Sequence, residues 1–211
     1  MGRTALHLAA EKGNQHLVRL LLEGGGERDL QDTLEHTALL LAAEREHKQV
    51  VQILLESSAD ANIPNSHRRT ALQIAAEQGN TDMVQELIDK GAKLDLSDQL
   101  GRTALWLAVE NGKKDVVHLL LDKGASREQR DSTARTPLLL AVANGDKVLV
   151  EALLNGTVNL HDQKYCLKLL SLAQQSGNQD VISLVNSNID FEKLSTPWIT
   201  WFKQAGRVLL P

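Results

Sequence analysis

Residues 103–121 read TALWLAVENGKKDVVHLLL, and this stretch decides the fold. The hydroxyl of Thr103 can cap a helix, and Leu105 and its apolar neighbours then lie on one buried side of that helix. Gly112 follows at the point where the chain must reverse and where a positive φ is useful. The later apolar residues recur at helical spacing. The stretch therefore predicts a hairpin of two short helices.

The same pattern recurs every 33 residues, with threonine at positions 4, 37, 70, 103 and 136. Small residues, which permit close stacking, occupy one repeat position: Ala9-Ala10, Ala42-Ala43, Ala75-Ala76, Ala108-Val109 and Ala141-Val142. The glycine of the reversal recurs as Gly13, Gly79, Gly112 and Gly145. Glu46 stands at that position in the second unit, which must either strain its turn or rearrange it. Because such short helices are unstable alone, a fixed period predicts stacked units that cover each other's apolar faces.

The motif T-[AP]-L-x-[LI]-A-[AV]-x-x-G, followed by V-x-x-L-L and G-A, resembles the ankyrin repeat. The resemblance covers residues 2 to about 190 and implies an all-α solenoid of 33-residue helix-turn-helix units, with β-turn fingers along one edge. The chain departs from the family motif in two ways. The motif histidine survives only as His7, and the motif proline only as Pro137.

We expect a repeat array over residues 1–194 and a separate tail over residues 195–211. Five clear repeats begin near Arg3, His36, Arg69, Arg102 and Arg135, and a degenerate sixth begins at about Lys168 and suits a terminal cap. The array begins abruptly, which indicates either a preceding repeat in a longer protein or a trimmed or alternative form. The tail carries Trp198, Trp201 and Phe202. It is interpreted as a lid over the last repeat, as an anchor for a partner, or as a disordered or foreign segment.

Composition and motifs exclude several classes of function. Lys and Arg (23) nearly balance Asp and Glu (27), so the net charge gives no electrostatic attraction for nucleic acid or an anionic membrane. No apolar run approaches the length of a membrane span. The single cysteine, Cys166, favours a reducing compartment, and we expect the cytoplasm or the nucleus. Catalytic motifs and metal-spaced histidines are absent from the sequence, and we expect no enzyme activity, cofactor or metal. The glycines at 24–26 lead into acidic residues and make a poor phosphate cradle.

The resemblance implies a partner surface on the concave face, built from first helices and finger tips. A basic column consists of the residues directly before the threonines: Arg3, His36, Arg69, Arg102 and Arg135. An acidic column lies seven residues after the threonines: Glu11, Glu44, Glu77 and Glu110, with Ala143 in the fifth repeat. One interpretation is an internal charge ladder of pairs such as Arg69 with Glu77. The other is a groove that accepts an acidic protein segment, with Arg102 and Arg135 as the first candidates.

Three apolar residues add to this candidate surface. Leu34 and Leu100 fall at finger tips and are plausible hydrophobic contacts. Trp106, on a first helix, is either a binding hot spot or a side chain packed beneath a neighbouring finger. The sequence thus favours a non-catalytic scaffold that binds another protein. Two alternatives remain: the recognition arm of a signalling adaptor, for example with a death domain outside this chain, or a regulatory subunit of an enzyme.

Overall fold

The computed structural model describes residues 2–155, 160 and 162–189. The chain divides into two compact units, which meet in the sequence at Pro137 and Leu138. The tail with Trp198, Trp201 and Phe202 lies outside the described residues, so the three interpretations of it stay open.

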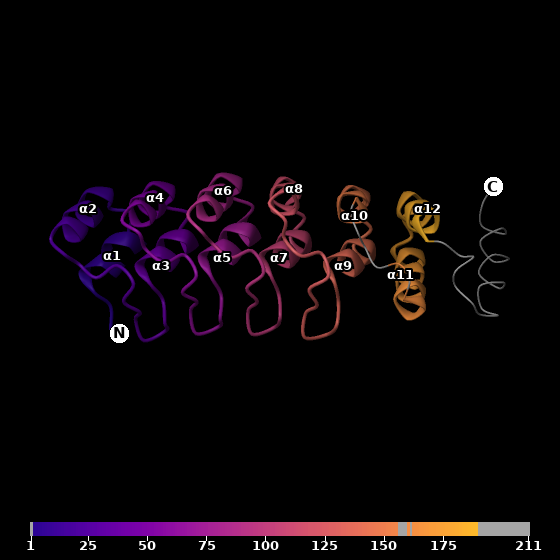
Figure 1. Cartoon of the computed structure of the whole chain (residues 1–211), viewed down its shortest axis with the longest axis horizontal. Coiled ribbons are helices and arrows are strands. Elements are labelled where there is room, and N and C mark those ends of the chain that lie inside the picture. The colour runs from indigo at the N-terminus through magenta and orange to yellow at the C-terminus, as the bar shows by residue number, and fades with distance from the viewer. Residues whose placement is uncertain (1, 156–159, 161, 190–211) are drawn as a thin grey trace. The chain divides into compact units, whose positions relative to one another are not determined.

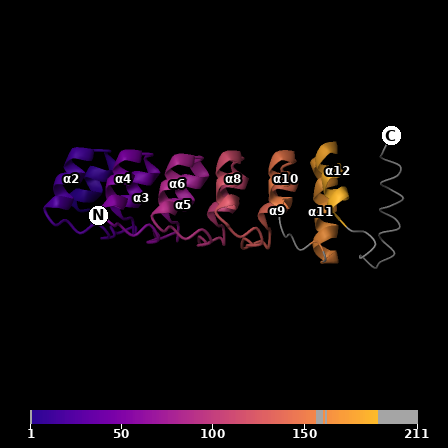
Figure 2. The ribbon, with the colours of Figure 1, turned by 45° about the horizontal axis from the view of Figure 1, so that its top comes forward.

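The first unit is a stack of helical hairpins (Figure 1). The first helices of the hairpins lie in one row: α1 (Ala5–Glu11), α3 (Ala38–Glu44), α5 (Ala71–Gln78) and α7 (Ala104–Glu110). The second helices form a parallel row: α2 (Gln15–Glu23), α4 (Lys48–Glu56), α6 (Thr81–Asp89) and α8 (Lys114–Asp122). Figure 2 shows the second row from another angle. Each first helix packs against the next first helix, and each second helix against the next second helix.

In the first four repeats the threonine caps the first helix, as the sequence predicted. The Thr103 hydroxyl accepts a hydrogen bond from the Trp106 N–H (3.2 Å), and the Thr37 hydroxyl accepts one from the Leu40 N–H (3.2 Å). The paired small residues of the first helices are almost fully buried. Since these helices have only seven or eight residues, their stability comes from this packing between hairpins.

In every hairpin of the first unit, the turn between the two helices contains a residue with left-handed backbone conformation. Gly13, Gly79 and Gly112 have φ of 69°, 84° and 64°, and Glu46 has φ of 56°. The second repeat therefore keeps the turn of its neighbours and places a glutamate in the strained left-handed conformation.

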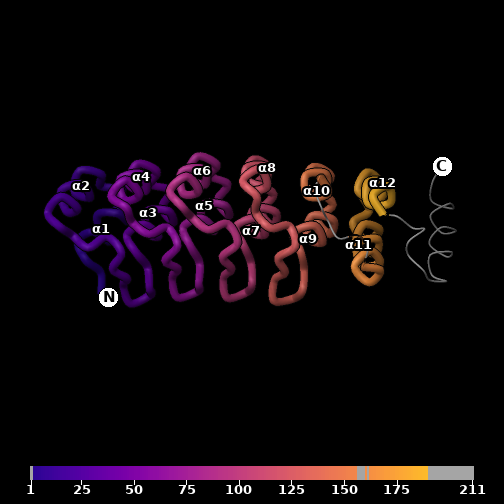
Figure 3. Tube along the Cα trace, viewed as in Figure 1, coloured from indigo at the N-terminus to yellow at the C-terminus, as the bar shows by residue number. Residues whose placement is uncertain are grey.

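Fingers connect the hairpins and project beside the first helices (Figure 3). An Asp or Asn folds each one: Asp98 Oδ1 accepts hydrogen bonds from the backbone N–H groups of Leu100 and Arg102, each at 2.9 Å. Neighbouring fingers are joined by single backbone hydrogen bonds: Ser66 N–H to Leu34 O (3.1 Å), Gln99 N–H to His67 O (3.1 Å) and Ser132 N–H to Leu100 O (2.8 Å). The fingers thus form a hydrogen-bonded row.

The second unit contains α10 (Lys147–Leu154), α11 (Gln163–Ser176) and α12 (Gln179–Asn188), and α9 (Pro137–Ala143) begins at the boundary. The sequence placed the start of a sixth repeat at about Lys168. The structure starts α11 earlier, with Asp162 as its cap, so Lys168 lies inside a helix of 14 residues. Val181 and Val185 of α12 are buried, while Ser187 and Asn188 face solvent. None of the helices in the described ranges has the length and apolar character needed to cross a lipid bilayer.

Candidate partner-binding surface

The basic column stands where each finger returns to a first helix, directly before the capping threonine. Its members pair with the acidic column eight residues later. Arg3 lies 2.6 Å from Glu11, His36 lies 3.2 Å from Glu44, and Arg102 lies 3.5 Å from Glu110. Arg69 pairs with Glu77. The geometry therefore favours the internal charge ladder over a free basic groove.

A second column, which the sequence reasoning missed, supplies carboxylates to four of the five basic residues, all but Arg69. It consists of the finger aspartates Asp32, Asp98 and Asp131, with Asn65 at the same position in the finger that leads to the third repeat. Arg102 donates to Asp98 Oδ2 at 2.9 Å from Nε, and Arg3 donates to Asp32 Oδ2 at 3.1 Å. The signal was present in the sequence, because an Asp or Asn stands five residues before the threonines at 37, 70, 103 and 136. The sequence analysis did not recognise that this Asp or Asn folds the finger by accepting hydrogen bonds from its backbone.

Asp131 shows how these carboxylates are held. Burial by itself raises the pKa of Asp131. Hydrogen bonds from the Arg135 backbone, the Thr133 and Arg135 side chains and the Thr133 backbone outweigh that effect, so its pKa lies below the usual value. Asp131 is therefore a charged group that both folds the finger and orients Arg135.

Trp106 is buried, with 1% of its surface exposed. The guanidinium groups of Arg102 and Arg135 lie 5.7 and 5.4 Å from the centroid of its ring. The distances fit cation–π contacts that pack the indole among the finger residues. This is the packing alternative of the sequence interpretation, so the indole itself offers a partner almost no surface.

His7, Gln73 and Trp106 each stand three residues after a capping threonine, and they differ in hydrogen bonding. Gln73 Nε2 donates to two finger carbonyls, Leu96 O (3.1 Å) and Arg102 O (2.7 Å). His7 makes the equivalent contacts: its Nδ1 accepts from the Thr4 N–H, so its Nε2 carries the proton. Among the residues that the structure describes, the buried Nε1 of Trp106 has no hydrogen-bond partner. Trp106 therefore contacts the finger that follows it through cation–π packing, whereas His7 and Gln73 donate hydrogen bonds to the carbonyls of theirs.

Arg135 is the most accessible member of the basic column. Its side chain is 43% exposed, against 21% for Arg102 and 23% for Arg69. Its Nε and Nη2 donate to Asp131 Oδ2 at 3.0 and 2.9 Å. Within the described part of the chain no second carboxylate pairs with it. Arg135 is therefore the member of the basic column most readily offered to a partner.

The finger tips supply the apolar component of the surface. Leu34 is 55% exposed and Leu100 is 51% exposed. The backbone carbonyl of each accepts a hydrogen bond from the next finger, so their main chains are held while their side chains face solvent. The predicted candidates thus separate: Leu34, Leu100 and Arg135 are accessible, while Arg69 and Arg102 are largely covered by their ion pairs.

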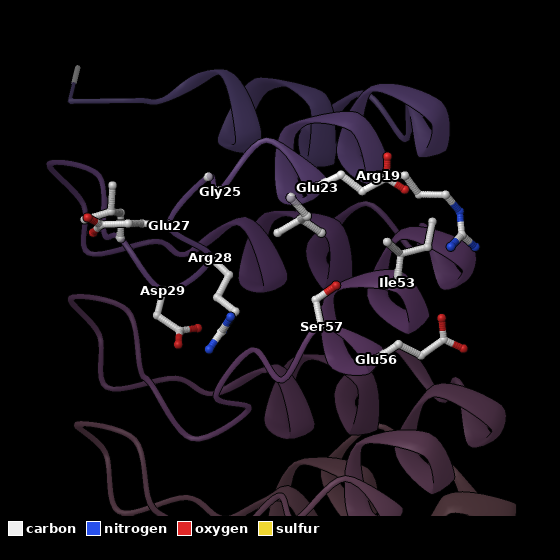
Figure 4. Close-up of a pocket in the computed structure, with 12 residues that line it drawn as sticks. Arg19, Glu23, Gly25, Glu27, Arg28, Asp29, Ile53, Glu56 and Ser57 are labelled. Carbon is white, nitrogen blue, oxygen red and sulfur yellow. The ribbon is translucent and has the colours of Figure 1, made fainter.

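A cleft of about 810 Å³ lies along the second helices of the first two hairpins. Figure 4 shows residues of α2 and α4 on one side of it and residues of the connecting loop on the other: Arg19, Glu23, Ile53 and Glu56, then Glu27, Arg28 and Asp29. Gly24 caps the end of α2, and Gly25 follows in the left-handed region at φ 82°. Acidic side chains outnumber basic ones in the lining, which disfavours phosphate.

Two family models match the chain. One, described as ankyrin repeats (3 copies), matches residues 1–65 and 57–131, and the other, described as ankyrin repeat, matches residues 134–164. The chain belongs to the ankyrin-repeat family. Its stacked hairpins and fingers are those of an all-α ankyrin-repeat solenoid, and ankyrin repeats are general modules of protein–protein interaction. Ankyrin-repeat proteins are typically non-catalytic scaffolds. No curated protein was found to match the chain.

Proposed function

We propose that this ankyrin-repeat chain is a non-catalytic scaffold that receives a protein partner on the fingers and first helices of its first unit. The observation that carries the proposal is the exposure of Leu34 and Leu100 at equivalent tips of a hydrogen-bonded row of fingers. Exposed apolar side chains on a backbone that is already ordered lose little entropy on binding, which favours their use as contacts.

The charges of this surface narrow the kind of partner. Most members of the basic column already have one or two carboxylates, so a long acidic segment would meet a nearly balanced surface. Arg135 pairs with a single carboxylate, that of Asp131, packs one face of its guanidinium on Trp106, and has the most exposed side chain of the basic column, at 43%. We propose a partner segment that places one carboxylate at Arg135 and apolar side chains against the finger tips.

The remaining candidates have lesser roles in this proposal. Glu77 and Glu110 are 36% and 38% exposed at their side chains while still paired to the basic column. They can accept hydrogen bonds at the rim without leaving those pairs. Arg69 and Arg102 act mainly by keeping the column neutral, so their substitution affects binding through the fold of the finger.

The experiment compares partner capture by the unmodified chain, by Arg135→Gln and by the double variant Leu34→Glu/Leu100→Glu. Proteins bound from a cell extract are quantified by mass spectrometry, and the control is Arg19→Gln on the opposite side of the hairpins. We expect both test variants to lose the same specific proteins and the control to retain them. Equal capture by all four proteins, with unchanged melting temperatures, would contradict the proposal.

We further propose that any catalytic or signalling output belongs to a different polypeptide or domain, as in a signalling adaptor or a regulatory subunit of an enzyme, in the cytoplasm or nucleus. The buried thiol of Cys166 is compatible with a reducing compartment. Native co-purification distinguishes the two roles, because a regulatory subunit brings an active enzyme with it. Imaging of the tagged protein checks the compartment.

A further inference from the structure

The finger tips are exposed in the interior of the stack, where a finger stands on each side. Leu100 is 51% exposed although its finger is hydrogen-bonded on both sides. Gln99 N–H donates to His67 O at 3.1 Å, and Ser132 N–H donates to the Leu100 carbonyl at 2.8 Å. Leu34, at the equivalent tip two fingers earlier, is 55% exposed. Exposure of the tip is therefore a property of the way a finger folds, and it does not depend on an end of the stack.

The finger between these two leucines carries an unpaired cation at its tip. Arg68 is exposed, and its side chain forms no ion pair with any residue that the structure describes. Its backbone is held in place, because its N–H donates to Asn65 O at 2.7 Å and its φ is 59°. The guanidinium thus projects from an ordered main chain, which limits the entropy that is lost when a carboxylate binds to it.

The same finger lacks a carboxylate that its neighbours have. Asn65 stands where the other fingers have aspartate. In the next finger, Asp98 Oδ2 accepts a hydrogen bond from Arg102 Nε at 2.9 Å. The equivalent Nε of Arg69 is buried and has no hydrogen-bond partner among the described residues. Arg69 pairs with Glu77 alone, so this finger carries more positive charge than the fingers beside it.

We infer, building on the proposed function, that the partner segment presents apolar and acidic side chains in alternation along the row of fingers. Its apolar side chains contact Leu34 and Leu100. One acidic side chain binds Arg68 between these leucines, and the other binds Arg135 beyond them. Complementary charges of this kind contribute more to specificity than to affinity, so Arg68 is the residue that selects an acidic group at the centre of the segment.

The charge at this tip position also fixes the register of the partner. The equivalent residues of the four fingers are Glu35, Arg68, Gly101 and Ala134. All four have left-handed φ, 74° at the glycine and 59° at the other three, so they present their side chains from the same backbone conformation. A segment shifted by one repeat would place its central acidic group either against Glu35 or beside the uncharged Gly101. Because like charges repel and an unpaired charge gains nothing, one register is favoured.

A phage-displayed library of random peptides tests the inference when it is selected separately on the unmodified chain and on Arg68→Glu. The control is Arg19→Glu, which makes the same charge change at an exposed arginine of α2. We expect the unmodified chain and the control to enrich peptides in which Asp or Glu lies between apolar residues. We expect Arg68→Glu to enrich Lys or Arg at that position instead.

Fluorescence anisotropy of one selected peptide gives the size of the effect. Arg68→Glu should weaken its binding by about tenfold or more, which corresponds to about 1.4 kcal/mol. Replacement of the acidic residue of the peptide by lysine should restore binding to Arg68→Glu and weaken binding to the unmodified chain. Circular dichroism melting verifies that each variant is folded.

The outcomes separate this inference from the proposed function. Peptides that lose binding to Leu34→Glu/Leu100→Glu but bind Arg68→Glu with unchanged affinity would overturn the inference and leave the proposed function standing. Enrichment of tip-binding peptides without acidic residues would have the same meaning. If no selected peptide depended on the two leucines, the proposed function and the inference would both be excluded.

Discussion

Replacement of Glu46 by glycine should stabilise the protein. Glu46 has φ of 56°, where its counterparts are Gly13, Gly79 and Gly112. A side chain in the left-handed region costs about 1–2 kcal/mol. Glycine removes that cost but raises the entropy of the unfolded chain, an opposing effect of about 0.5–1 kcal/mol. The side chain of Glu46 is exposed and makes no hydrogen bond to any residue that the structure describes, so no contact among these residues is lost.

The net gain is about 0.5–1 kcal/mol, and in a chain of this size it corresponds to a rise in melting temperature of roughly 1–4 °C. Urea denaturation followed by circular dichroism measures the free energy of unfolding, and thermal melting measures the shift. The backbone hydrogen bonds from Glu46 N–H to Ala43 O and from Lys48 N–H to Glu46 O are unaffected by the change.

Two controls separate backbone strain from loss of the glutamate. Glu46→Ala removes the charge but keeps a Cβ at positive φ, so it should give little or no gain. Gly112→Ala is the reverse change at φ 64°, with no atom within 4 Å of the new methyl group, and should destabilise the chain by about 1 kcal/mol. If Glu46→Gly lowered the melting temperature, or if Glu46→Ala matched its gain, the strain argument would be wrong.

Three further substitutions probe the fingers. Asp131→Asn should cost about 0.5–1 kcal/mol at neutral pH, because the ion pair to the partly exposed Arg135 is lost while an amide can still fold the finger, as Asn65 does. Since the folded pKa of Asp131 lies below the unfolded value of 3.8, its charge adds stability above that pH, and the contribution disappears as pH falls through the lower folded value. Urea titrations between pH 3 and 7 should therefore show a smaller acid-induced loss in Asp131→Asn. Gln73→Leu should cost about 1–3 kcal/mol and speed amide exchange in residues 96–102, because it leaves buried backbone groups unpaired. Trp106→Ala should cost about 3–5 kcal/mol in urea denaturation, and a loss below 1 kcal/mol would argue against its burial.

The repeat and its local structure were readable from the sequence. Threonine at a 33-residue period, small residue pairs and a recurring reversal glycine depend on contacts within one hairpin or between identical neighbours, so each copy repeats the same signal. The same register placed Glu46 at the reversal, and the structure decided between the two alternatives in favour of a strained turn. These features are local, and local physics acts in the same way in every unit.

Exposure was decided only by the tertiary structure. Leu8 and Leu41 occupy the same motif position, yet one is 46% exposed and the other 2%, because a neighbouring hairpin covers only the second. Trp106 could have faced solvent, and its burial depends on two arginines from different fingers that converge on its ring. The pairing of the basic column with the finger aspartates likewise arises from the way each finger folds back. A periodic sequence specifies how one unit packs, whereas accessibility depends on what lies beside that unit in space.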